Sequence, residues 1–368
     1  MKAALVNTSD LKNFVASVLM KNGVSPAGSQ VAADVLLFAD SRGIHSHGVG
    51  NLHRIYLPRI RSGAIVPSAE PRMVADHHAV CLIDAQHGLG IATAPQAMEE
   101  AIRRAQQFGI GAAAVRGSSH FGSAGYYAVM AERRGMVGMA FSNLGSQTIA
   151  RHPDGRMALC GTNPLSVAAP SEQHPAFALD MSTTAVSTGK VRSAMRRGET
   201  TPPGWLVDDE GGTVTDPARY FERTAHLQFL GGDGPSGGYK GFGLALMVDL
   251  LAGILPGAYV GPDSRLFEPG GHGTADQDIG HLFLALDIAK FRPLGEFRAD
   301  LDRMLSAVLQ SPGRPGRPPA VYPGYPEAAA AAQLPPGMVS VEGDDLERLA
   351  EIAREFASPL PQSVEWNS

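Results

Sequence analysis

Residues 78–109, HAVCLIDAQHGLGIATAPQAMEEAIRRAQQFG, decide the fold class of this chain. The apolar run at 78–85 predicts a buried strand, and residues 94–109 predict a helix. The glycine-rich turn GLGIATA (88–94) joins the two. A strand, a tight turn and a helix in this order are typical of an α/β protein.

The turn stands where a dinucleotide-binding fingerprint would stand, but two parts of that pattern are missing. The fingerprint needs Gly or Ala at its sixth position, where this chain has Thr93. It also needs an acidic residue at the end of the next strand, where Arg116 and Gly117 stand. The sequence therefore favours a plain strand-to-helix turn over a Rossmann phosphate loop.

The rest of the chain alternates between helical and strand patterns. Capping residues and amphipathic or apolar periodicity predict helices at 9–23, 28–41, 123–135, 238–255, 297–310 and 344–357. Apolar runs bounded by Gly, Pro or polar residues predict strands at 110–117, 135–145, 164–170 and 177–184. The Pro and Gly content of 311–326 predicts a loop.

Bulk composition excludes several classes of partner. The 368 residues are 44% hydrophobic and 18% charged, with a net charge of -5, as in an ordinary soluble globular protein. This mild acidity without a basic run argues against nucleic acid. No signal peptide pattern and no apolar run of 18 residues is present, so we expect no membrane partner. Cys81 and Cys160 form no metal or redox motif, so we expect reduced thiols and a cytoplasmic location.

The stretch GIHSHGVGNLHR (43–54) holds three histidines and an arginine. A metal site on His45 and His47 is one interpretation, but no carboxylate or cysteine stands nearby at ligand spacing. An acid–base histidine beside Ser46 is the second, because imidazole titrates near neutral pH. A polar helix–loop junction without chemistry is the third.

Two further segments are candidates for a site. In GSSHFGSAGYY (117–127), His120 follows a predicted strand and is either a site residue or a hydrogen-bonded core histidine. In GPSGGYKGFG (234–243), glycines precede a helix and Lys240 adds a positive charge, which suits a phosphate. The alternative for the second segment is a glycine-hinged helix start with a solvated lysine.

Taken together, these segments resemble the type-2 malate/L-lactate dehydrogenase family, which also contains ureidoglycolate, sulfolactate and diketogulonate oxidoreductases and the piperideine/pyrroline-2-carboxylate reductases. The resemblance runs from about residue 5 to residue 357. The matching segments occur in the family's order, which makes the set specific; they are SRGIHSHGV, DAQHGLGIATAPQAMEEAI, SSHFGSAGYYA, GMVGMAFSN, GTNPLSVAAP, LDMSTT, GKV, PPGW, DP, GGYKGFGLALMVDLL and GHLFLALD.

The resemblance implies an α/β fold with a non-Rossmann nicotinamide-binding domain at about 76–254. It implies a second, discontinuous α/β domain for substrate and dimerisation, built from residues 1–75 and about 255–368. The implied cofactor is NADH or NADPH. The implied reaction is hydride transfer to the C=O of a 2-oxo acid or to the C=N of a cyclic 2-imino acid, in a homodimer without a metal.

The family's motifs carry roles onto this chain. His47, with Ser46 beside it, is the favoured proton donor or acceptor, and His120 is the second candidate, which would orient substrate or nicotinamide. Asp180 matches an aspartate near the site that could hold an imidazole. The implied cofactor contacts are His120, Asn143, Asn163, Pro164, Asp180, Met181, Ser182, Thr183, Thr184, Lys240, Gly241, Pro323 and Gly324.

Three departures from the family pattern bear on the substrate. Asn51 stands where the family usually has an arginine that holds the substrate carboxylate, and asparagine cannot supply that charge. His45 replaces an acidic residue, and Tyr325 replaces the glutamate of a PGE loop. We therefore expect a non-standard substrate. The alternatives are an ordinary 2-hydroxy acid dehydrogenase that uses Arg54 as its clamp, or an inactive cofactor-binding homologue.

Overall fold

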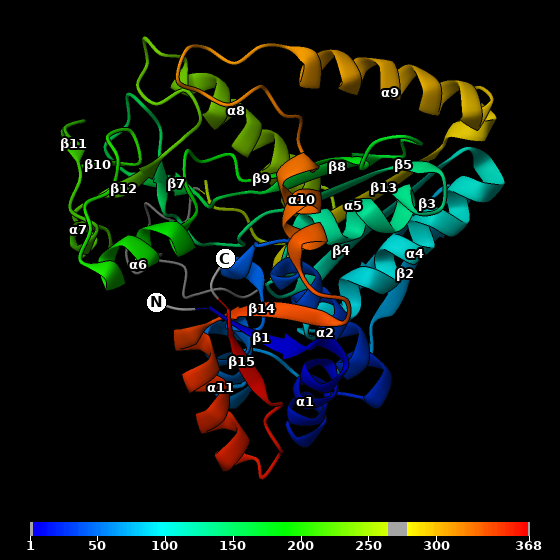
Figure 1. Cartoon of the computed structure of the whole chain (residues 1–368), viewed down its shortest axis with the longest axis horizontal. Coiled ribbons are helices and arrows are strands. Elements are labelled where there is room, and N and C mark those ends of the chain that lie inside the picture. The colour runs from blue at the N-terminus through cyan, green and yellow to red at the C-terminus, as the bar shows by residue number, and fades with distance from the viewer. Residues whose placement is uncertain (1–2, 264–277, 367–368) are drawn as a thin grey trace.

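The computed structural model describes residues 3–263 and 278–366, which form three β-sheets with helices packed on and between them (Figure 1). Residues 1–2, 264–277 and 367–368, which the predicted domain division includes, lie outside the described residues.

The largest sheet has seven strands in the order β2-β3-β4-β13-β5-β8-β9. The pair β3–β4 is parallel and the other neighbouring pairs are antiparallel, which confirms the expected α/β fold without a parallel Rossmann sheet. The strands are β2 (Arg72–His77), β3 (Val80–Asp84), β4 (Ile110–Ser118), β5 (Met136–Ser142), β8 (Leu165–Ala169), β9 (Phe177–Met181) and β13 (Ile279–Asp287).

Helical backbone lies against both faces of this sheet at glycine positions. On one face, Gly111 of β4 faces the carbonyl of Ala101 in α4 (Gly90–Phe108), and Gly138 of β5 faces that of Ala128 in α5 (Ala124–Glu132). On the other face, Gly280 of β13 faces a π-helical segment, η3 (Asp249–Ile254), which continues α8 (Gly238–Val248). A Cβ at any of the three glycines would overlap the helix backbone.

Two smaller sheets complete the fold. The order β11-β10-β12-β6-β7 forms a five-stranded sheet, and β14-β1-β15 brings both ends of the described chain into a three-stranded sheet. Their strands are β1 (Ala3–Asn7), β6 (Ala150–Arg151), β7 (Ala158–Cys160), β10 (Leu206–Val207), β11 (Thr213–Val214), β12 (His226–Gln228), β14 (Met338–Glu342) and β15 (Ser363–Trp366).

The remaining helices pack around these sheets. Helices α1 and α2 share an apolar core with residues of β1, β14 and α11, and Figure 1 shows α1 and α11 beside the small sheet. The remaining helical segments are α1 (Thr8–Lys21), α2 (Pro26–Asp40), η1 (His45–His47), η2 (Leu52–Tyr56), α3 (Leu57–Arg61), α6 (Thr188–Arg197), α7 (Ala218–Phe221), η5 (Ile288–Lys290), α9 (Leu294–Gln310), α10 (Tyr325–Gln333) and α11 (Gly343–Glu355).

The predicted elements are present with shifted ends. The helix expected at 94–109 begins earlier, at Gly90, so most of the predicted turn at 88–94 is already helical. The helix expected at 238–255 changes to π-helical geometry at Asp249. The loop expected at 311–326 ends where α10 begins, at Tyr325. Among the described residues, no helix has the length and apolar character needed to cross a bilayer.

The predicted two-domain division stays a prediction, but one strand pairs across the predicted boundary. Strand β13 belongs to the terminal segment in that division, yet it pairs with β4 and β5 at the centre of the large sheet.

We predict that Gly138→Ala destabilises the protein. The added methyl group would overlap the Ala128 carbonyl, and overpacking of this kind costs about 1–3 kcal/mol. Gly295→Ala in α9 is the matched control, because nothing lies within 4 Å of the added carbon there. Urea unfolding should show a lower free energy of unfolding for the first variant and an equal or higher one for the second. Equal stabilities for the two variants would contradict this packing account.

Candidate active site

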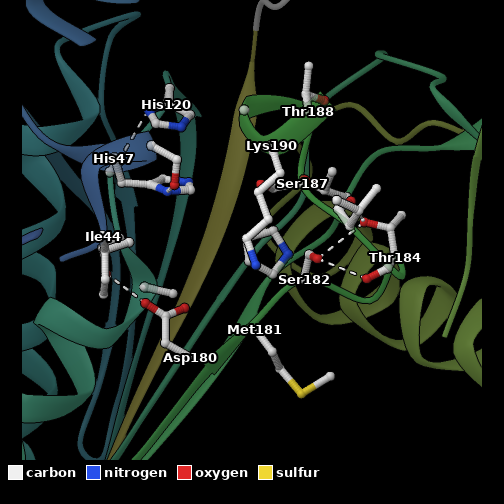
Figure 2. A pocket seen from close by; sticks show the side chains of 18 of the residues that line it. Ile44, His47, His120, Asp180, Met181, Ser182, Thr184, Ser187, Thr188 and Lys190 are labelled. Carbon is white, nitrogen blue, oxygen red and sulfur yellow. Dashed lines mark hydrogen bonds between the residues drawn. The ribbon is translucent and has the colours of Figure 1, made fainter. Parts of the chain in front are cut away.

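A large cleft gathers residues that lie far apart in the sequence. Its volume is about 1980 Å³, beyond the roughly 300–1,000 Å³ of common small-molecule pockets, so it has room for a dinucleotide together with a small substrate. Figure 2 shows His47 and His120 on one wall and Ser182, Thr184 and Ser187 across from them. The walls come from η1, the β4–α5 connection, the end of β9, α6 and α7.

His47 lies in the short turn η1, which a buried carboxylate holds in place. Asp40 accepts hydrogen bonds from the Val49 amide (2.7 Å) and pairs with Nδ1 of His45 (3.0 Å). A Cβ at Gly48 would overlap this carboxylate, which explains a glycine after His47. Within the turn, Oγ of Ser46 lies 2.9 Å from Nδ1 of His47.

His120 lies next to His47, with the two rings stacked at a centroid distance of 5.8 Å and an angle of 16°. The Gly122 amide donates to Nδ1 of His120 (3.3 Å), and the hydroxyl of Tyr56 lies 2.8 Å from the same atom. An amide N–H can only donate, so Nδ1 is an acceptor and the proton of the neutral ring is on Nε2. Burial raises the pKa of Tyr56 well above its usual value, so this phenol remains a neutral donor.

Burial disfavours the charged form of both imidazoles. Burial lowers the pKa of His47, with Asp180 opposing this effect and Arg54 adding to it. Burial also lowers the pKa of His120 well below the usual value for histidine, and positive charge at His47 acts in the same direction. For His45, burial lowers the pKa, but the hydrogen bond with Asp40 and the negative charges of Asp40, Glu342 and Asp345 together outweigh it and raise the pKa.

Asp180 stands at the end region of β9, exposed to the cleft. Its Oδ2 accepts hydrogen bonds from the Ser123 hydroxyl (2.6 Å) and the Gly125 amide (2.8 Å). In the part of the chain that the structure describes, its hydrogen bonds thus go to the start of α5 and not to an imidazole. Its negative charge nevertheless acts on His47, where it favours the protonated ring.

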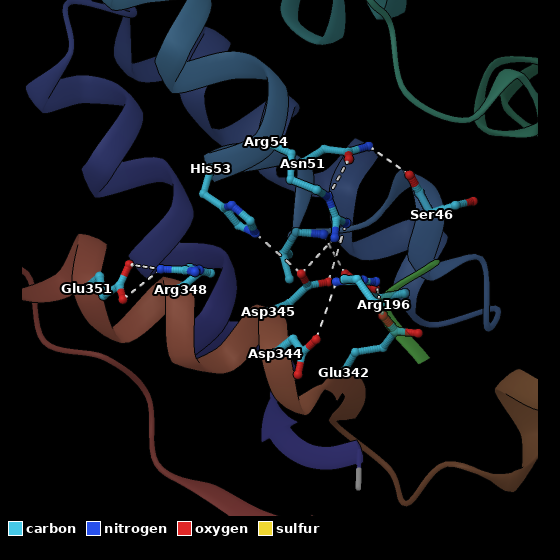
Figure 3. A network of polar contacts seen from close by, with 12 residues as sticks. Ser46, Asn51, His53, Arg54, Arg196, Glu342, Asp344, Asp345, Arg348 and Glu351 are labelled. Carbon is cyan, nitrogen blue, oxygen red and sulfur yellow. Dashed lines mark hydrogen bonds and ion pairs between the residues drawn. The ribbon is translucent and has the colours of Figure 1, made fainter. Parts of the chain in front are cut away.

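Asn51 and Arg54 belong to a polar network that reaches α11 (Figure 3). The guanidinium of Arg54 donates to both oxygens of Asp345, at 2.8 and 3.4 Å, and its Nε donates to Oδ1 of Asn51 (3.3 Å). Asn51 donates in turn to the carbonyl of Ser46 (3.0 Å) and is 3% exposed. Arg54 therefore lines the cleft with its charge already balanced by Asp345.

The predicted cofactor contacts divide into two groups. Residues that line the cleft are His120, Asn143, Pro164, Asp180, Met181, Ser182, Thr184 and Gly324. Residues outside its lining are Asn163, Thr183, Lys240, Gly241 and Pro323. The glycine-rich loop before α8 is in the second group, and Lys240 is exposed at the start of that helix.

Asn163 is fully buried and does not line the cleft, but it holds a residue that does. The side-chain amides of Asn143 (3.2 Å) and Asn163 (2.8 Å) donate to the two oxygens of Asp249 in η3. Burial raises the pKa of Asp249, although these hydrogen bonds oppose the shift. Asn163 thus fixes the adjoining Pro164, which lines the cleft.

Several residues that line the cleft, or that hold its lining residues in place, carry no signal in the sequence. Tyr56 reaches His120 across 64 positions, and Asp345 reaches Arg54 across 291, so no local pattern could have paired them. The polar segment at 187–190 and Arg192 also line the cleft, and no predicted helix or strand covered them. Within residues 3–263 and 278–366, no group of three or more His, Cys, Asp or Glu side chains is arranged to hold a metal ion.

Comparison with known proteins places these residues in a family context. A sequence model described as malate/L-lactate dehydrogenase matches residues 6–349. Malate dehydrogenase from Pyrococcus horikoshii is 38% identical over 83% of this chain and 82% of its own. The (2R)-3-sulfolactate dehydrogenase (NADP(+)) from Chromohalobacter salexigens is 35% identical over 84% of this chain and 88% of its own. The crystal structure of malate dehydrogenase from Entamoeba histolytica superposes with a TM-score of 0.91, at 27% identity, over 98% and 100% of the two chains.

We predict that His120 is a neutral Nε2–H tautomer at pH 7. Its ring should gain a proton only below pH 6.5, because burial disfavours the charge. Tyr56→Phe removes a donor to the neutral ring and should raise this pKa toward the usual value. Ring-nitrogen NMR of histidine-labelled protein measures both, with His120→Asn to assign the signal. A proton on Nδ1 in the wild type would contradict the geometry.

Proposed function

Because the chain belongs to the malate/L-lactate dehydrogenase family and is an NAD(P)-dependent oxidoreductase, we propose that it transfers hydride to the C=O of a 2-oxo acid or the C=N of a cyclic 2-imino acid. One observation carries this proposal: two stacked imidazoles and Asp180 line a cleft that can hold a dinucleotide and a substrate together. NADH or NADPH supplies the hydride when bound.

We propose that His47 is the proton donor in reduction. A carbonyl oxygen that receives hydride at its carbon becomes an alkoxide unless an acid delivers a proton. Asp180 favours the protonated form of His47, while burial makes that proton easy to give up. In the reverse reaction, the neutral ring accepts the proton of the hydroxyl group.

His120 has a different proposed part. Its Nδ1 is occupied by Tyr56 and Gly122, so Nε2–H is its remaining donor. A neutral N–H can orient and polarise a carbonyl oxygen without giving up its proton. We assign orientation of the substrate to His120 and proton transfer to His47.

The substrate is proposed to be non-standard for the family. The side chain of Asn51 is neutral, so it offers no positive charge to a carboxylate. It is also buried, and its amide already bonds with the Ser46 carbonyl and the Arg54 guanidinium. An ordinary 2-hydroxy acid dehydrogenase with Arg54 as clamp is the alternative, and the pairing of Arg54 with Asp345 weighs against it. An inactive homologue is the least favoured reading, because His47, His120 and Asp180 share one cleft.

A homodimer is proposed from an exposed apolar stripe on α8 and η3. Leu246, Met247, Leu250 and Ile254 follow each other at helical spacing, and each is 37–63% exposed. Apolar surface of this kind is typical of a protein–protein interface.

A cytoplasmic location is proposed from the two cysteines, which are both unpaired and buried.

We predict that the protein oxidises NADH or NADPH with at least one member of a panel of 2-oxo acids and cyclic 2-imino acids, followed by loss of nicotinamide absorbance. His47→Gln should lower kcat by about 10²–10⁴-fold, the usual contribution of general acid–base catalysis. His77→Gln, on an exposed residue of β2, is the control and should leave kcat unchanged. Nicotinamide binding without turnover on the whole panel would favour the inactive homologue.

We predict that light scattering gives twice the 38.7 kDa mass of one chain. Leu250→Glu places a charge on the apolar stripe and should shift the mass toward one chain. Phe291→Glu is the control, because Phe291 is 72% exposed away from the stripe. A monomeric wild type would refute the proposed dimer.

A further inference from the structure

The first turn of helix α6 lies against the turn that carries His47. A Cβ at Gly189 would lie 3.0 Å from Cβ of Ser46, so the first turn of α6 packs against η1. Arg192, three residues later, lines the same cleft. The helix therefore places a guanidinium in the cleft that also holds the proposed proton donor.

The surroundings of Arg192 suit an anion. Its guanidinium lies 5.7 Å from the ring centroid of Phe221, on the cleft wall formed by α7. Burial of the side chain and the positive charge of Arg54 both lower the pKa of Arg192, while Tyr220 opposes the shift. An anion bound to Arg192 would offset this repulsion.

Neighbouring arginines of the cleft differ from Arg192 in their partners. Arg54 pairs with Asp345, and Arg196 pairs with Glu342 and Asp344 (Figure 3). Among the described residues, Arg192 and Lys190 have no carboxylate within ion-pair distance. Arg192 is the one whose charge interacts with Arg54, the residue bonded to Asn51.

We propose that Arg192 binds the carboxylate of the substrate and so supplies the charge that Asn51 lacks. The proposal rests on the proposed function, and it makes Arg192 a residue that determines which substrates bind. A planar guanidinium donates two parallel hydrogen bonds to a carboxylate, which fixes the orientation of the 2-oxo group beside it. The acid group of the substrate is thus held from α6 and not from the turn after His47.

The test is Arg192→Gln. It should lower kcat/KM for an active 2-oxo acid by about 10- to 100-fold, mainly through KM, as expected for loss of a charge-assisted hydrogen-bond pair. The dissociation constant for NADH or NADPH should change less than about twofold. Arg192→Lys should recover part of the loss, since it keeps the charge but not the paired donors. The primary amide of the same 2-oxo acid should react equally with wild type and Arg192→Gln.

A binding measurement separates this inference from the proposed function. Calorimetric titration with oxalate needs no turnover, and its affinity should fall about tenfold in Arg192→Gln. Arg197→Gln is the matched control on the same helix, because Arg197 pairs with Glu199 outside the cleft. An inactive wild type that binds oxalate through Arg192 would refute the proposed function alone. Equal oxalate affinity, or equal kcat/KM, in wild type and Arg192→Gln would overturn the role of Arg192.

Discussion

Close contact between helix backbone and sheet at Gly111, Gly138 and Gly280 is the constraint on which the cleft depends. These glycines lie on adjacent strands β4, β5 and β13, so α4, α5 and η3 are all fixed against the same three strands. The start of α5 then meets Asp180, and η3 presents Asp249 to the asparagines beneath the cleft. Side chains on elements locked in this way lose little freedom when a ligand binds.

Local patterns predicted five of the seven strands of the large sheet, but they did not predict β2, β13 or the short strands of the smaller sheets. The strand at 80–84 and the helix α4 each have several periodic residues, which is why 78–109 predicts both. Strands of two residues, such as Ala150–Arg151, carry no pattern and exist because neighbouring strands pair with them. Thr93, the residue that breaks the dinucleotide-binding fingerprint, is buried within α4 and contributes to packing there.

For the site, too, sequence motifs predicted the main residues but not the partners that lie far from them in the sequence. Motifs named His47, His120 and Asp180, and the structure brings these three to one cleft. Their electrostatics come from partners that no motif contains, because Tyr56 sets the tautomer of His120 and Ser123 holds Asp180. Desolvation then lowers the pKa of both imidazoles, a property of the folded surroundings and not of the residue type. Sequence could therefore name the chemical groups but not their protonation states.

The contact between Arg54 and Asp345 makes the cleft depend on a distant part of the chain. Its two residues are 291 positions apart, so a growing chain carries an unbalanced Arg54 until α11 has left the ribosome. Helices α1 and α2 likewise wait for β14 and α11 before their shared core is complete. A chain that ends before α11 therefore lacks both the charge partner of Arg54 and part of the core that α1 and α2 share.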